Sequence, residues 1–434
     1  MKKRNIFMGA LLVCTMFGMT SCKDLGAGYD NPIGSYMAVD EQVYVGVGKT
    51  VSINPTTISD GNVLYTSSNE KIATVDANGN VTGLMSGEVD ITATVEETKG
   101  YYSSTAVSRV IVRVEDAEQL AADIAEKTKN KYYTLRLYLA PNAKIELNDG
   151  ITFPNKPIYI VGEVEKPATI TVGNSIIIQN SFSLQNAKFD VSDLTKDKPL
   201  VKLAETKSES NYYIYNVNFS GIEVKNLKSQ FFYGNKETHC LIEYFQVSDC
   251  VIGIDGSTKK TVFDFNSSGN FANMYIGSST IYANPAQEQA GGFLSTQGAK
   301  KINDVFGYNQ NTSIWNSTFY NLSYNKNFCS QIENNKDYLH FMIGYNIFVN
   351  CGKKNQLLKA LGGNAANIQK TTDWYVNSNL FMYDNENTRD SELIGNYTSA
   401  DEMNSIYGKV TFKNPEQGDF HQNDTWVGDS RWTN

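Results

Sequence analysis

Histidine and charge are both scarce in this chain of 434 residues, which has three histidines and 19% charged residues. Lysine and arginine number 38 against 46 acidic residues, giving a formal charge of −8, and no basic run contains interleaved aromatic residues. Because such a surface repels a phosphate polymer, nucleic acid is not expected as a partner. His239, His340 and His421 lie in separate segments without a nucleophile or a metal-ligand spacing, so we expect a structural role for each.

Cysteine is also infrequent, and the six cysteines form neither a CxxC pair nor a Cys/His cluster of the kind that binds zinc. Their spacing is not that of a small disulfide-stapled scaffold either. Beyond Cys14 and Cys22, the chain contains Cys240, Cys250, Cys329 and Cys351. We therefore expect mostly buried thiols, and we predict no metal site and no cofactor.

Aromatic residues are abundant by contrast, with 26 tyrosines and 21 phenylalanines, and asparagine becomes frequent from Asn142 onward. Aromatic residues favour strands, and asparagine favours tight turns. A hydrophobic fraction of 41% over 434 residues is enough for two or three domains with cores. The composition thus predicts an all-β protein with more than one domain.

An apolar stretch runs from Ile6 to Met19, and it is too short to span a bilayer. It follows three basic residues and precedes Cys22, so residues 1–22 are interpreted as a targeting segment. The sequence from Met19 to Cys22 resembles the lipobox of bacterial lipoproteins, which implies that Cys22 becomes acylated and anchors the chain. An ordinary secretory signal with an incidental cysteine is the alternative.

A linker over residues 23–37 is predicted to follow. Its Lys23-Asp24 start resembles the export tags of surface lipoproteins in Bacteroidetes, and the next four residues are rich in glycine. The chain is thus expected to be attached to the outer membrane by its lipid and to face the cell surface.

Short alternating apolar runs separated by turn signals fill residues 38–115, a pattern typical of a small β-sandwich. Within it, Asn78-Gly79 supplies the positive-φ turn of a hairpin. The stretch from Tyr65 to Ala93 resembles the group 2 bacterial immunoglobulin-like domain, with Tyr65 in place of a usual tryptophan. Since a fold alone names no ligand, the domain is interpreted as a spacer between the membrane and the rest of the chain.

The next domain, predicted over residues 116–385, begins with one amphipathic helix. Asp116 to Gln119 form a capping-box start, after which Leu120, Ala121 and Ile124 fall on one helical face. Past this helix the sequence has strand and turn signals without a helical period.

A repeat of about thirty residues runs through this domain in seven copies. Each copy has an aliphatic residue two positions before a turn residue, drawn from Leu184, Ile214, Val247, Ile276, Ile314, Ile343 and Val376. The turn residues are Asn186, Asn216, Asp249, Ser278, Asn316, Tyr345 and Ser378. The large apolar residues three positions after the turn are Phe189, Phe219, Ile252, Ile281, Phe319, Phe348 and Phe381. A bend repeated in this way predicts a parallel β-solenoid in which like residues stack in internal columns. Phe319 is expected to point into the coil and its neighbour Tyr320 to point outward. Replacement of Tyr320 is therefore expected to cost little stability.

The capping helix and these coils resemble the right-handed parallel β-helix of the pectate-lyase-like superfamily. The likeness is strongest to Bacteroidetes lipoprotein domains of unknown function, whose C-termini carry Gly-Asp-Phe followed by Gly-Asp-Pro-Arg-Trp. Here these motifs are Gly418-Asp419-Phe420 and Gly428-Asp429-Ser430-Arg431-Trp432. Residues 386–434 are accordingly predicted to be a C-terminal cap, because a solenoid must cover its exposed edges.

Alternation along the strands identifies the side chains that leave the coil, since residues one and three positions before the turn point outward when the aliphatic residue points inward. The aromatic residues in this outward set are Tyr213, Tyr215, Tyr275, Trp315 and Tyr375. Planar rings with hydrogen-bonding edges are suited to stacking on sugars, so these five are predicted to form a polysaccharide-binding strip. The alternative is that loops of the longer coils pack on the rings.

The pectate-lyase-like resemblance implies enzymes that cleave uronic-acid polymers with calcium-bound carboxylates and an Arg or Lys base, or that hydrolyse them with aspartates. No such cluster can be assembled here, and arginine beyond residue 116 is limited to Arg136, Arg389 and Arg431. We therefore predict no catalytic residues and a lipoprotein that binds polysaccharide, with other glycan-uptake proteins as further partners. One alternative is a polysaccharide lyase or glycoside hydrolase, in which calcium would be a cofactor. Another is an adhesin or structural surface protein without a glycan ligand.

Overall fold

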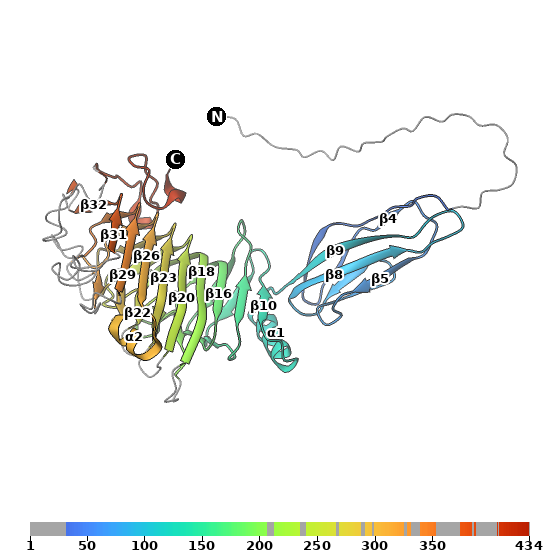
Figure 1. The fold of residues 1–434 in the computed structure, drawn as a ribbon, viewed down its shortest axis with the longest axis horizontal. Helices are drawn as coiled ribbons and strands as arrows, with labels where there is room; N and C mark the ends of the chain where they lie inside the picture. The colour runs from blue at the N-terminus through green and yellow to red at the C-terminus, as the bar shows by residue number, and fades with distance from the viewer. Residues whose placement is uncertain are drawn as a thin grey trace.

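The computed structural model describes residues 32–205, 212–234, 240–265, 269–287, 291–296, 299–324, 328–330, 339–352, 374–383, 386–387, 406 and 408–433. Figure 1 shows a sandwich of strands joined to a long stack of parallel strands. The described part of the chain has two α-helices, α1 (Ala117–Lys129) and α2 (Ala299–Phe306). Neither of these helices has the length and hydropathy that crossing a membrane requires. The predicted all-β fold class is confirmed.

The first domain has a four-stranded sheet in the order β2-β9-β8-β5, a three-stranded sheet in the order β3-β7-β6, and the pair β1-β4. The strands are β1 (Met37–Ala38), β2 (Gln42–Gly46), β3 (Thr50–Ser52), β4 (Thr56–Thr57), β5 (Val63–Ser67), β6 (Ala73–Val75), β7 (Asn80–Gly83), β8 (Gly87–Val95) and β9 (Ser104–Arg113). Alternation in β8 buries Val89, Ile91 and Ala93 in the core between the sheets. The predicted hairpin joins β6 and β7 at Gly79, whose φ is 77°, and the Tyr65 ring packs against this turn.

The helix α1 begins as predicted, because the Asp116 carboxylate accepts a hydrogen bond from Gln119 N at 2.8 Å. Leu120 is buried and Ile124 is half-buried against the first coil, which α1 covers. Ala121 is exposed, contrary to the expectation, because the inner helix face is formed by Leu120, Asp123, Ile124 and Lys127, and Ala121 is turned about 100° from Leu120.

This buried ion pair joins the first domain to the solenoid. Lys127 Nζ and Asp123 Oδ2 lie 3.0 Å apart, with side chains only 4% and 3% exposed. Ser86 of the first domain donates from its N to Asp123 Oδ1 at 3.2 Å, and Lys127 Nζ donates to Ser86 Oγ at 3.1 Å. Burial lowers the pKa of Lys127, against the opposing effect of Asp123. Since removing either partner would leave a buried, unpaired charge, these contacts hold the two domains in one orientation.

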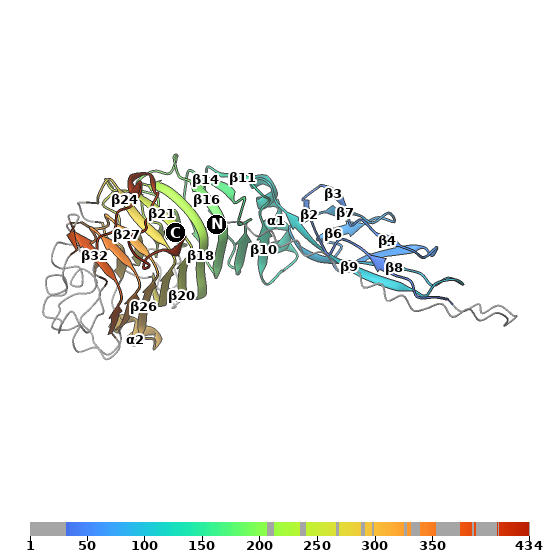
Figure 2. The same cartoon turned by 90° about the horizontal axis from the view of Figure 1, so that it is seen from above.

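The second domain is a parallel β-helix with a 17-stranded and a 7-stranded sheet (Figures 1 and 2). The 17-stranded sheet bends at a corner in its coils, and we call its two sides the first and second sheets and the 7-stranded sheet the third. The first sheet contains β10 (Leu135–Tyr138), β13 (Ile158–Val161), β16 (Phe182–Asp190), β18 (Tyr212–Leu227), β20 (Cys240–Ser248), β23 (Gly269–Gly277), β26 (Gln310–Trp315), β29 (Leu339–Gly344) and β31 (Trp374–Asn377). The second sheet contains β11 (Lys144–Leu147), β14 (Ala168–Val172), the C-terminal halves of β16 and β18, β21 (Val251–Asp255), β24 (Thr280–Asn284), β27 (Thr318–Tyr320), β30 (Ile347–Val349), β32 (Leu380–Tyr383) and the antiparallel β33 (Glu386–Asn387). The third sheet contains β12 (Ile151–Thr152), β15 (Ile176–Ile178), β17 (Val201–Leu203), β19 (Phe232–Tyr233), β22 (Phe263–Phe265), β25 (Leu294–Thr296) and β28 (Cys329–Ser330).

The interior of the coils is packed with stacked aliphatic and aromatic residues. Phe319 is fully buried, and its ring stacks on Phe348 at 5.0 Å and 9°. Phe348 in turn stacks on Phe381 at 5.3 Å and 17°. The predicted internal column of phenylalanines is therefore confirmed in these coils, where in-register parallel strands place like residues above one another.

The corner between the first and second sheets lies at the predicted turn residues, with one exception. Positive φ angles of 45° to 59° occur at Asn186, Asp249, Ser278, Asn316, Tyr345 and Ser378. The prediction for Asn216 is wrong, because it lies inside β18 and the corner of that coil is Gly221, with φ of 64°. Phe219 thus stands two positions before the corner, and Val224 takes the place three positions after it. The error arose because Ile214 and Phe219, which both point into the coil from the long strand β18, have the same spacing as the aliphatic and large apolar positions of the repeat.

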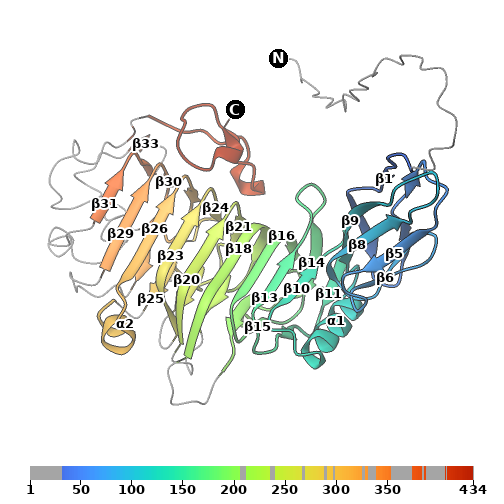
Figure 3. The same cartoon turned by 45° about the vertical axis from the view of Figure 1, so that its right-hand side comes forward.

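The C-terminal segment, residues 408–433, lies over the second sheet (Figure 3). Phe420 is fully buried and packs on Tyr282 of β24 at 5.1 Å. Tyr320 of β27 points out of the coil, as expected, but it is half-buried because Phe412 and Phe420 cover it at 5.9 and 5.6 Å. The expectation that its removal costs little is therefore corrected.

The four described cysteines pack in the solenoid as thiols. Cys240, Cys250, Cys329 and Cys351 are all buried and unpaired, as expected. Burial raises the pKa of Cys250 and of Cys351 to about 12. The thiolate, which is the reactive form, is thus disfavoured, and these residues act as small core side chains.

Candidate functional site

The outer side of the first sheet carries three columns of side chains at fixed distances from the corner. The column three positions before it is Ser183, Asn218, Gln246, Tyr275, Ser313, Met342 and Tyr375. The column one position before it is Gln185, Ser220, Ser248, Gly277, Trp315, Gly344 and Asn377. The column five positions before it is Asn216, Tyr244, Asn273, Asn311 and His340. None of these described residues is Lys, Arg, Asp or Glu, and we call the area that they form the uncharged face.

Two rings lie flat on the uncharged face because glycines stand beneath them. A Cβ built on Gly344 would lie 2.2 Å from Cζ3 of Trp315, and one built on Gly277 would lie 2.3 Å from Oη of Tyr275. Any larger residue at these two positions would push the rings away from the backbone. Tyr275 is 40% exposed, so the ring offers solvent the surface on which a sugar can stack.

Trp315 is also the centre of an aromatic cluster. Its ring lies 5.7 Å from Tyr375 and 5.9 Å from Tyr345, and Tyr345 lies 5.6 Å from Trp426 of the C-terminal segment, which is 67% exposed. Tyr345 has φ of 59°, a conformation that is strained for a bulky side chain. The C-terminal segment holds this corner through Gly428 N, which donates to Tyr345 O at 2.8 Å.

The structure separates the five predicted strip residues into two groups. Tyr275, Trp315 and Tyr375 lie together on the uncharged face. Tyr213 and Tyr215 are exposed, at 46% and 59%, but they lie on β18 beyond the third column, because the corner of their coil is Gly221. Tyr215 contacts Tyr244 at 5.4 Å, at the margin of the face. The five residues therefore do not form one continuous strip.

Amide and hydroxyl groups cover the rest of the uncharged face. Asn311 Nδ2 donates to Asn273 Oδ1 at 2.7 Å, and Asn218 Nδ2 donates to Ser183 Oγ at 3.1 Å, in both cases between neighbouring coils. Asn218, Asn273 and Asn311 are half-buried and keep part of their polar surface in solvent. Groups that both donate and accept hydrogen bonds match the hydroxyls of a sugar.

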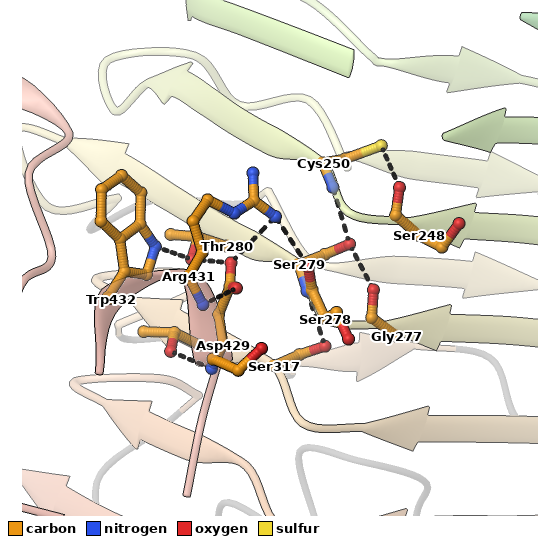
Figure 4. A network of polar contacts seen from close by, with 12 residues as sticks. Ser248, Cys250, Gly277, Ser278, Ser279, Thr280, Ser317, Asp429, Arg431 and Trp432 are labelled. Carbon is orange, nitrogen blue, oxygen red and sulfur yellow. Dashed lines mark hydrogen bonds and ion pairs between the residues drawn. The ribbon is translucent and has the colours of Figure 1, made fainter. Parts of the chain in front are cut away.

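A groove of about 780 Å³ lies on the other side of the corner, between the second sheet and the C-terminal segment. Figure 4 shows the clamp that forms one wall, in which Thr280 Oγ1 donates to the buried Asp429 Oδ2 at 2.8 Å. Arg431 N donates to Asp429 Oδ1 at 3.1 Å, and Arg431 Nη2 donates to Ser278 O at 2.7 Å. Trp432 Nε1 donates to Thr280 Oγ1 at 2.7 Å. The Gly-Asp-Ser-Arg-Trp motif thus fastens the C-terminal segment to the solenoid.

Two of the four carboxyl groups that line this groove, Glu223 and Asp429, are engaged by the protein itself. Burial acts to raise the pKa of Glu223, but ion pairs with Lys225 at 3.0 Å and Lys188 at 3.4 Å outweigh it and hold the pKa below its usual range. Burial raises the pKa of Asp429, although Arg431 opposes this. Both oxygens of Asp429 are already hydrogen-bonded. Since a general acid or base must face the substrate, these two carboxyl groups do not form a catalytic pair.

The histidines make local contacts where the structure describes them. His421 Nδ1 lies 2.5 Å from Asp419 Oδ1, and this contact is the main cause that lowers the pKa of Asp419 to about 2. His340 Nε2 lies 3.1 Å from Asn309 Nδ2 at the margin of the uncharged face. His239 lies outside the described residues.

The described ranges contain no group of three His, Cys, Asp or Glu side chains that could hold a metal ion. Cys22 and Arg389 lie outside those ranges. Arg136 lies over the Tyr159 ring at 5.7 Å, near the start of the solenoid, and Arg431 belongs to the clamp.

The sequence reasoning missed four residues that shape the uncharged face. Tyr345 was visible as the one aromatic residue in the turn set, and Gly277 and Gly344 were visible as glycines one position before a turn. Trp426 carried no signal, because only the folded C-terminal segment brings it to Tyr345.

Comparison with known proteins identifies two segments of the chain. Residues 42–105 match the bacterial Ig-like domain (group 2), which confirms that resemblance, and residues 143–284 match a domain of unknown function, DUF4957. A 3-O-alpha-D-galactosyl-alpha-L-arabinofuranosidase from Bifidobacterium longum subsp. longum is 38% identical over 90 residues. That match covers 20% of this chain and 8% of the enzyme, so the chain spans a small part of that relative.

Proposed function

We propose that this chain is a non-catalytic surface lipoprotein that binds a polysaccharide on its uncharged face. The observation that carries the proposal is the pair of rings, Trp315 and Tyr275, that rest flat on Gly344 and Gly277. Each ring can contribute about 1 kcal/mol by stacking, and the neighbouring amides can bond sugar hydroxyls. Binding then depends on several rings and amides together.

One further observation supports a carbohydrate-related role, and a second supports binding rather than catalysis. The short match to a galactosyl-arabinofuranosidase joins this chain to a protein that acts on sugars. Two of the four carboxyl groups that line the groove, Glu223 and Asp429, are held by Lys225 and Arg431 and are not available for acid and base chemistry.

The proposed location follows from the arrangement of the chain. Cys22 would carry the lipid at the outer membrane, and the Ig-like domain would act as a spacer. Because Asp123 and Lys127 lock that domain to the solenoid, the uncharged face would keep one orientation relative to the spacer. Other glycan-uptake proteins on the cell surface would be its neighbours.

A polysaccharide panel tests the function. The purified full chain is assayed for retention on each polymer and for unsaturated or reducing-end products. Retention without products supports the proposal. Products would show a lyase or hydrolase, and neither retention nor products would favour an adhesin or structural protein.

The anchor is tested separately with Cys22→Ala. Stable attachment of a lipoprotein needs its acyl groups, so the variant should leave the membrane fraction and appear in the soluble fraction. A variant that stays with the membrane at the wild-type level would contradict the anchor.

A further inference from the structure

We infer that the ligand of the uncharged face is a neutral polysaccharide, free of uronate and sulfate groups. This inference rests on the function proposed above and adds the chemical class of the glycan. It is argued from the charges on and around the face.

Anionic polymers are held by Lys and Arg, which pair with carboxylate and sulfate groups. The three columns of the uncharged face contain neither residue over the coils from β16 to β31. Two acidic residues, Glu243 and Asp249, border the face, and Arg136 belongs to the first coil, before the face begins. Glu243 accepts a hydrogen bond from Tyr244 and raises the pKa of this phenol, and burial together with Asp249 raises the pKa of Tyr275. The negative charges of these acidic residues repel a polyanion and do not affect a neutral polysaccharide.

The cations close to the corner are already paired on its far side. Arg431 reaches the corner at Ser278 O, but its guanidinium lies 3.2 Å from Asp429 Oδ2. Lys188 and Lys225 lie on the outer side of the second sheet, where both pair with Glu223. Their charges are thus compensated before a ligand arrives.

The arrangement of the rings also suits an extended chain of sugars. Tyr275, Trp315 and Tyr375 come from different coils of the same sheet, and the path from Tyr275 to Tyr375 crosses three coil steps. At about 4.8 Å per step this is roughly 14 Å, which is longer than one sugar unit. A bound chain would cross the strands along the solenoid axis and end beside Trp426, the exposed ring next to Tyr345.

The test compares two arms of soluble polymers in affinity electrophoresis with the full chain. The neutral arm is arabinan, galactan, arabinoxylan and glucomannan, and the anionic arm is polygalacturonate, alginate and chondroitin sulfate. Each is measured at low and at high sodium chloride, because salt screens charge pairing but not ring stacking. Trp315→Ala serves as the site variant, and Glu243→Gln serves as its matched control at the margin of the face.

We expect retention in the neutral arm, with a Kd that changes less than about twofold with salt. Trp315→Ala should weaken that retention about fivefold, as the loss of about 1 kcal/mol predicts, and Glu243→Gln should leave it unchanged. Retention only in the anionic arm, weakened by salt, would overturn the neutral class and leave polysaccharide binding intact. Retention in neither arm would reject the proposed function and the inference with it.

Discussion

The first and second sheets are built from the same coils, yet their outer sides have opposite roles. From β16 to β31 the three described columns on the outer side of the first sheet are uncharged, and the Tyr275 and Trp315 rings lie against glycines. The outer side of the second sheet begins with charged residues at Lys188 and Glu223 and then becomes apolar beneath the C-terminal segment. An outward aromatic residue is therefore a packing residue on one sheet and a binding candidate on the other, although alternation alone treats both alike.

The largest expected effect lies inside the coil, beneath both sheets. Phe319→Ala removes a fully buried ring that stacks on Phe348, so it should lower the free energy of unfolding by about 3–5 kcal/mol. Tyr320→Ala removes packing against Phe412 and Phe420, and a cost of about 1–2 kcal/mol is expected. Denaturant unfolding of both variants measures the difference. Equal losses would mean that the second sheet is not covered as described.

The attachment of the C-terminal segment is the next largest effect. Asp429→Ala leaves Thr280 and Arg431 without their buried partner, which should cost about 1–3 kcal/mol and speed proteolytic cleavage in residues 408–433. Asp419→Ala is the control, because Asp419 is bonded to the partly exposed His421 at the surface. Mass spectrometry of a timed digest measures both variants. Similar digestion of Asp429→Ala and the wild type would show that the clamp does not hold the segment.

The clamp also has a pH dependence with a defined sign. Burial raises the pKa of Asp429 in the folded chain above its unfolded value. Protonation therefore favours the folded segment below the unfolded pKa, and this contribution is lost as the pH rises through the folded pKa. The cleavage rate of the segment, measured relative to Asp429→Asn, should increase with pH over that window. A ratio that does not change with pH would contradict the raised pKa.

The sequence predicted the solenoid well because its signal is repeated. The corner residues from Asp249 to Ser378 follow the pattern, and each copy supports the others. The pattern failed where one coil used Gly221, since glycine reaches positive φ without the polar side chain that the pattern required. The predicted positions of Tyr213 and Tyr215 were wrong for the same reason, because the column of a strand residue is counted from the corner of its coil.

The candidate site was less predictable, because much of it depends on contacts between distant segments. Trp315 and Tyr275 could be placed by alternation, but their flat orientation depends on glycines in the same sheet. Trp426 is 81 residues beyond Tyr345 (426 minus 345), and no local pattern joins them. The contacts of Phe412 and Phe420 with Tyr320 of the second sheet likewise could be seen only in the structure.

The rings of the first sheet should affect binding without affecting stability. Trp315→Ala combined with Tyr275→Ala removes about 2 kcal/mol of stacking, or about thirtyfold in Kd, from whichever glycan the wild type retains. The melting temperature should stay nearly unchanged, since neither ring fills the coil. Affinity electrophoresis and thermal unfolding are read together. A matching loss of stability would show that the rings are packing residues, as on the second sheet.

The smallest expected effect separates the presence of a ring from its orientation. In Gly344→Ala the new Cβ would lie 2.2 Å from Cζ3 of Trp315, so the ring must leave the backbone while every aromatic group is kept. Retention of the glycan should fall severalfold, less than in the double variant, because a tilted ring keeps part of its contact with the sugar. Gly34→Ala is the matched control, since a Cβ at Gly34 meets no atom within 4 Å. If both glycine variants bind like the wild type, the flat ring is not what the sugar contacts, and the first sheet owes its affinity to the amide columns alone.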